Sequence, residues 1–154
     1  MRTVAPGRME YEVMADILHE FHRSRADASF HPIVGSGPNA CVLHYRANSR
    51  QMQDGELLLI DAGCEYQYYA SDISRTIPVG GRFSPRQRAV YEIVRAAQAA
   101  AERNAKPGQA WKATSDSAQA VIGRGLAKLG LIEAPDATYE CGSAQRPQTC
   151  SQVS

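Results

Sequence analysis

Several features that assign a chain to a special class of protein are missing from these 154 residues. No run of eighteen apolar residues occurs, and the first residues, MRTVAPGRMEYEV, lack the apolar segment of a signal peptide. We therefore expect neither a membrane-spanning helix nor a secretory signal, and we expect a cytoplasmic location. Seventeen Lys and Arg against sixteen Asp and Glu give a net charge of +1, which offers no electrostatic basis for binding nucleic acid or an anionic membrane.

The cysteines lack the spacing of a metal or redox motif. Cys41, Cys64, Cys141 and Cys150 form no C-x-x-C pair, which argues against a zinc knuckle or a thioredoxin-like site and favours reduced thiols. The remaining composition, 44% hydrophobic and 21% charged, is typical of a single globular domain.

Apolar periodicity and turn residues predict a helix, then strands, then two further helices. A turn cluster, GSGPN, interrupts residues 30–45, which are expected to form either two short strands or a strand and a loop. Ser84 is a natural N-cap with Pro85 at the first helical position. The expected helices cover residues 9–23, about 84–106 and 114–131, and the later strands cover residues 56–63 and 71–81.

The last twenty residues differ from the rest of the chain. Residues 135–154 contain one branched aliphatic residue, Val153, and no usable periodicity. We therefore expect one folded domain over residues 1–134 and a divergent, disordered tail over residues 135–154.

Two carboxylates stand out in the strand region. Asp61 ends the apolar run LLLI, and Asp72 follows eleven residues later. A hairpin with a two-residue loop at Tyr66-Gln67 would place them directly opposite, with Cβ atoms about 5 Å apart, where like charges are destabilising unless a cation neutralises them. Alternatively, Asp61 caps the strand and Asp72 pairs with Arg75 or a backbone amide, and spacing alone favours this structural role.

A resemblance bears on that choice. The segments IVGSGPNACVLHY and DGELLLIDAGCEYQYYASDISRTIPVGGRFSPRQRAVYEIV resemble the first half of the catalytic domain of the Xaa-Pro aminopeptidases. These enzymes belong to the pita-bread metallopeptidase family, which includes aminopeptidase P and prolidase. The resemblance runs from about residue 6 to residue 131. It implies an α/β (α+β) half-domain of the pita-bread type, with an antiparallel or mixed sheet and helices on one face.

The resemblance also implies roles for three residues. Asp61 would bind one metal ion, Asp72 would bridge two divalent ions, commonly Mn²⁺, and His44 would line the substrate pocket. The implied reaction removes the N-terminal residue from a peptide with proline second, using a water activated by the dinuclear centre. Without the resemblance, His44 would be interpreted as a partly buried, hydrogen-bonded ring. Phe30 stands where the family is expected to carry a tyrosine that hydrogen-bonds near the site.

The implied site is incomplete in this sequence. The family requires a histidine and two glutamates beyond the aspartates, and no histidine follows His44. We expect weak or no metal binding by the chain alone, with activity requiring a complementing chain or a homo-oligomer. The alternative is an inactive truncated fragment or interaction module, with a tail that arises from a frameshift or truncation.

Overall fold

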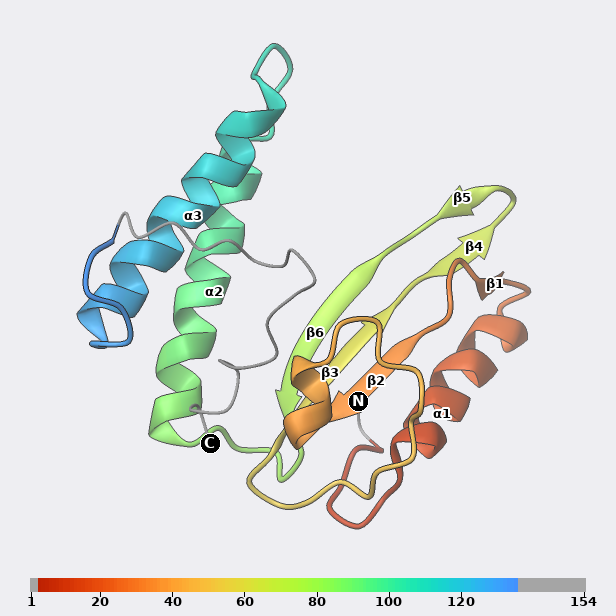
Figure 1. Cartoon of the computed structure of the whole chain (residues 1–154). Coiled ribbons are helices and arrows are strands. Elements are labelled where there is room, and N and C mark those ends of the chain that lie inside the picture. The colour runs from red at the N-terminus through yellow and green to blue at the C-terminus, as the bar shows by residue number, and fades with distance from the viewer. Residues whose placement is uncertain (1–2, 136–154) are drawn as a thin grey trace. The chain divides into compact units, whose positions relative to one another are not determined.

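The computed structural model describes residues 3–135, which fall into two compact units on either side of the link between Phe83 and Ser84. The first unit contains one α-helix, a short 3₁₀ helix and six strands, and the second contains two α-helices (Figure 1). The elements of the first unit are α1 (Glu10–Arg23), β1 (Asp27–Ala28), β2 (Ile33–Ser36), η1 (Gly37–Cys41), β3 (Leu57–Ala62), β4 (Cys64–Tyr66), β5 (Tyr69–Ala70) and β6 (Ile73–Pro78).

Every strand pairing in the first unit is antiparallel. One sheet has the order β2-β3-β6, and a smaller sheet has the order β1-β4-β5. Figure 1 shows that β3 with β4 and β5 with β6 form the two arms of one long hairpin, with α1 beside β1 and β2. The antiparallel sheet with a helix on one face confirms the α/β architecture expected from the sequence.

The core of the first unit lies between α1 and one face of the main sheet. Strand alternation buries Leu58 and Ile60, and Val34 of β2 pairs with Ile60 and joins them on that face. Val13 of α1 packs against this cluster, as the predicted amphipathic helix requires. The other members of the cluster are Met52 and Val79. Asp61, the next residue after Ile60, consequently points to the opposite face of the sheet.

The region around the GSGPN cluster, residues 30–45, forms a strand and a loop, which is the second of the two predicted alternatives. β2 ends at Ser36, η1 covers Gly37–Cys41, and residues 42–50 form no strand. The loop over residues 42–50 carries His44.

The predicted hairpin exists, but its register differs from the prediction. Tyr66 pairs with Tyr69, so the two-residue loop is Gln67-Tyr68 instead of Tyr66-Gln67. Gln67 and Tyr68 have φ of 50° and 68°, the left-handed values of a type I′ turn. As a result Asp61 lies opposite Ser74, and the predicted direct opposition of Asp61 and Asp72 is wrong.

The second unit is a helical hairpin of α2 (Pro85–Asn104) and α3 (Trp111–Lys128). Ser84 caps α2 as predicted: the Gln87 amide donates to Ser84 Oγ at 3.2 Å, and the Ser84 amide donates to Gln87 Oε1 at 2.9 Å. The predicted tail, residues 135–154, lies outside the described residues except for Pro135. Among residues 3–135, no helix has the length and hydropathy of a membrane span.

Replacing Tyr68 by glycine tests the turn. We expect Tyr68→Gly to raise the free energy of unfolding by about 0.5–1 kcal/mol, because glycine adopts the left-handed conformation without a steric penalty. The matched control is Tyr69→Gly, one residue later in β5, which should lower the free energy of unfolding by a similar amount. Urea denaturation followed by circular dichroism measures both, and a destabilised Tyr68→Gly protein would contradict the assigned turn.

Candidate metal and substrate site

One cavity of about 330 Å³ in the first unit contains all three residues that the sequence predicts for a site. Asp61 and Asp72 come from the hairpin, and His44 comes from the loop over residues 42–50. The other lining residues are Phe30, His31, Ile33 and Arg46. The structure therefore brings the predicted residues together, while their roles as ligands and substrate contact stay predictions.

Strand register explains why both aspartates face this cavity. Asp61 pairs with Ser74, and the same register continued by two residues would place Asp72 opposite Gly63. Side chains alternate with a period of two, so a displacement by two residues keeps Asp61 and Asp72 on one face as diagonal neighbours. Asp61 Oδ1 also accepts a hydrogen bond of 2.7 Å from Ser74 Oγ, which orients the carboxylate.

The regular strand pairing is interrupted next to Asp72, although the Ser71 amide still donates to the Cys64 carbonyl oxygen at 2.9 Å. Two further hydrogen bonds hold Ser71: the Cys64 amide donates to Ser71 Oγ at 3.0 Å, and Ser29 Oγ donates to the Ser71 carbonyl oxygen at 2.7 Å. Gly63 is required here, because a Cβ at this position would collide with the Ser71 carbonyl. This break places Asp72 between β5 and β6, where it is exposed to solvent.

The predicted ion pair between Asp72 and Arg75 is wrong for the described part of the chain. Arg75 Nη1 instead donates to the Ser74 carbonyl oxygen at 2.8 Å. Within residues 3–135 the Asp72 carboxylate has neither a hydrogen bond nor an ion pair, so it is available to a ligand.

The loop that carries His44 is held from behind by its neighbour Tyr45. The Tyr45 hydroxyl donates to Glu10 Oε2 at 2.8 Å and accepts a hydrogen bond of 2.8 Å from Asn39 Nδ2. His44 itself is exposed and has φ of 52°, a left-handed value that histidine adopts more readily than most residues. This exposure contradicts the alternative of a partly buried ring and leaves the imidazole accessible from the cavity.

Glu10 is the fixed point behind that loop. Its side chain is fully buried, and its carboxylate accepts hydrogen bonds from the Ser36 amide at 2.7 Å, the Ser36 hydroxyl at 2.8 Å and the Arg50 amide at 3.1 Å, besides Tyr45. Burial, the largest influence, opposes ionisation, but these hydrogen bonds together outweigh it and lower the pKa of Glu10. The ionised carboxylate thus joins α1 to β2 and to the site loop.

Sequence reasoning missed three of the cavity residues. Ile33 pairs with Asp61 across β2 and β3, and His31 lies two residues earlier on the same side of the chain. Pairing β2 with β3 from the sequence would have identified Ile33, whereas His31 precedes the strand. No signal in the sequence indicates Arg46, because the irregular loop alone brings it to the cavity.

The donor chemistry suits a hard divalent cation, because carboxylate oxygens are the ligands that Mn²⁺ and Mg²⁺ prefer. The number of donors falls short of a complete centre: residues 3–135 contain no group of three or more His, Cys, Asp or Glu side chains placed to hold a metal ion. The described residues therefore fit a partial ligand set contributed by Asp61 and Asp72.

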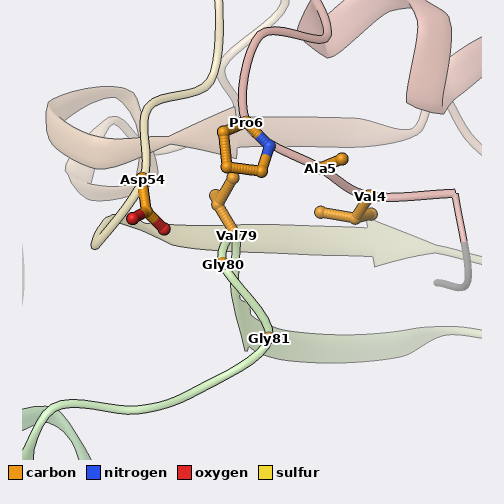
Figure 2. Close-up of a pocket in the computed structure, with 7 residues that line it drawn as sticks. All are labelled: Val4, Ala5, Pro6, Asp54, Val79, Gly80 and Gly81. Carbon is orange, nitrogen blue, oxygen red and sulfur yellow. The ribbon is translucent and has the colours of Figure 1, made fainter.

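A second hollow lies at the other end of the β3 and β6 pair (Figure 2). It is lined by Val4, Ala5, Pro6, Asp54, Val79, Gly80 and Gly81, among which Asp54 is the only ionisable side chain. Its single carboxylate makes it a useful control for the cavity that holds Asp61 and Asp72.

The chain belongs to metallopeptidase family M24, whose model matches residues 1–144 and so reaches into the predicted tail. Among curated proteins it is 48% identical to the Xaa-Pro aminopeptidase of Haemophilus influenzae over 134 residues, covering 86% of this chain and 31% of that one. It is 41% identical to the Xaa-Pro aminopeptidase of Escherichia coli, covering 96% and 34%. The chain thus spans about a third of the length of these relatives.

Solved structures give the same family. Aminopeptidase PepP of Pseudomonas aeruginosa matches with a TM-score of 0.84 and 46% identity, covering 86% of this chain and 30% of that one. Zinc-substituted Escherichia coli aminopeptidase P in complex with product matches with a TM-score of 0.82 and 44% identity, covering 84% and 30%. These matches confirm the predicted resemblance and the pita-bread type of fold for this part of the chain.

Glu10→Gln tests the role of the buried carboxylate. We expect the free energy of unfolding to fall by about 3 kcal/mol, because the amide NH₂ group would face buried donors that the carboxylate now satisfies. Glu20→Gln, an exposed position on the same helix, should change it by less than about 0.5 kcal/mol. Urea denaturation of both variants measures the difference. Equal effects would show that the buried Glu10 carboxylate does not stabilise the fold more than an exposed glutamate does.

The pH dependence of stability tests the charge on Glu10. A carboxyl group whose pKa is lowered by folding stabilises the folded state above its unfolded pKa and loses this contribution as the pH falls through the folded pKa. We therefore expect stability to decline below the ordinary glutamate value of 4.5, with a shallower decline in Glu10→Gln. Glu56 and Asp16, whose pKa values are also lowered, should preserve part of the decline. Unfolding measured from pH 3 to pH 7 would contradict this if both proteins followed the same profile.

Proposed function

We propose that this chain forms part of the active site of a metal-dependent Xaa-Pro aminopeptidase. The observation that carries the proposal is the convergence of His44, Asp61 and Asp72 in one cavity. Membership of family M24 and the Xaa-Pro aminopeptidase relatives support it. The proposed reaction releases the N-terminal residue from a peptide whose second residue is proline.

In this proposal Asp61 would bind one divalent ion and Asp72 would contribute to binding both ions of a pair. The ions, proposed to be Mn²⁺, would supply an activated water and a polarised scissile carbonyl. Asp61 is held in a fixed orientation by Ser74, whereas the exposed Asp72 carboxylate is free to bridge. A solved relative that carries zinc supports a divalent metal in the family.

His44 and the apolar side chains of the cavity are proposed to bind the peptide. The exposed imidazole of His44 can hydrogen-bond the substrate backbone, and its loop is held in place through Tyr45 and Glu10. Phe30 and Ile33 supply an apolar wall of the kind on which a proline ring packs. A solved Escherichia coli aminopeptidase P in complex with substrate, with a TM-score of 0.80, supports a peptide ligand.

The small number of metal-ligating side chains bears on both candidate functions. Residues 3–135 contain no group of three such side chains, so an active enzyme would need further ligands, which are proposed to come from a complementing chain or a second copy. If they do not, the chain is an inactive fragment or an interaction module with the ancestry of a metallopeptidase.

The test is hydrolysis of Ala-Pro-Ala by the purified chain with added Mn²⁺. We expect weak turnover that EDTA abolishes and that falls at least about a hundredfold in the double variant Asp61→Asn, Asp72→Asn. Asp54→Asn, which changes the carboxylate of the second hollow, should leave turnover unchanged.

Turnover that survives EDTA or the double variant would contradict the metal assignment. Absence of turnover at every Mn²⁺ concentration would support the second candidate function. Metal analysis separates the two directly, because a complemented enzyme should copurify with the missing chain and bind close to two ions per assembled site.

A further inference from the structure

Arg46 gives the cavity a positive charge that the proposed reaction does not use. Its guanidinium group shares the cavity with Asp61 and Asp72, but it belongs to a different segment, the loop over residues 42–50. Within residues 3–135 no ion pair or hydrogen bond joins the Arg46 guanidinium to a carboxylate, and the residue is exposed. The cavity therefore presents two negative charges and one uncommitted positive charge.

The loop holds Arg46 at the cavity. Tyr45 is anchored by its hydroxyl to Glu10, and Asn48 is buried with its backbone carbonyl accepting a hydrogen bond of 3.0 Å from the Tyr11 amide. Arg46 lies between these two fixed points, so its backbone is tethered while its side chain reaches the cavity. A tethered but unpaired guanidinium loses less freedom on binding a ligand than one on a mobile loop.

The charges in the cavity match those at the two ends of a short free peptide. Carboxylates attract the N-terminal ammonium group, or metal ions that take its place, and a planar guanidinium binds a carboxylate through two parallel hydrogen bonds. A volume of about 330 Å³ lies at the lower end of small-molecule sites. An extended tripeptide spans about 10 Å, which makes it a ligand of the size expected for a cavity of this volume.

We propose that Arg46 binds the C-terminal carboxylate of di- and tripeptides and so selects short peptides with a free C-terminus. This inference rests on the proposed function for the peptide as ligand, and it adds the length and the terminal group of that peptide. A longer peptide, or a peptide with an amidated C-terminus, cannot place a carboxylate against Arg46.

Peptide binding without turnover tests the proposal separately from catalysis. Ala-Pro-Ala and its C-terminal amide are titrated into the ¹⁵N-labelled chain in EDTA, and amide chemical shifts report each Kd. We expect the acid to bind about three- to fivefold more tightly than the amide, which is the range of a solvent-exposed ion pair. Arg46→Gln should remove this preference, and Arg46→Lys should retain part of it.

The matched control is Arg82→Gln, which removes an exposed arginine of the same unit outside the cavity and should keep the full preference. Equal affinity for acid and amide, an unchanged preference in Arg46→Gln, or no binding of either peptide would overturn the proposal. A preference for the acid in a chain that never hydrolyses it would uphold the role of Arg46 and count against the proposed aminopeptidase activity.

Discussion

The first unit depends on one buried negative charge, the carboxylate of Glu10. Removing a carboxylate from water costs several kcal/mol unless hydrogen bonds replace the lost hydration. The replacements come from Ser36 at the end of β2 and from Tyr45 and the Arg50 amide in the loop over residues 42–50. Because these hydrogen bonds compensate the buried charge, they fix the loop over residues 42–50 against β2 and α1. The positions of the cavity residues on that loop follow from a helix residue that never reaches the cavity.

The hairpin shows which parts of a strand prediction are robust. A two-residue loop at Tyr66-Gln67 would place Asp61 opposite Asp72, whereas the structure pairs Asp61 with Ser74, a shift of two residues. The shared face nevertheless survives, because only an odd shift moves a side chain to the other face. The turn could not be located from sequence, since Gln67 and Tyr68 adopt left-handed backbone values without the Asn-Gly or Gly residues that normally signal them.

Local signals predicted the helices, and distant contacts escaped prediction. The Ser84 cap and the apolar spacing of α1 involve residues within one or two turns, so they can be found in a single sequence. Glu10, by contrast, looks like an ordinary acid in the first turn of a helix, and its partners begin 26 residues away. Arg46 and His31 lie in irregular segments that come together with the hairpin only in the folded chain. The residue pattern therefore drew attention to Asp61 and Asp72 alone, and the family resemblance was needed to add His44.

The charge balance of the cavity limits what can cover it. Asp61 accepts one hydrogen bond from Ser74, and Asp72 depends on solvent in the described part of the chain. Two carboxylates on one face are tolerable while water reaches them, but burial without compensation would cost more than a small domain can lose. Any segment, ligand or second chain that closes over this face must therefore bring positive charge. Divalent ions and a peptide ammonium group satisfy this demand, and Arg46 alone does not, because one positive charge leaves a net negative cavity.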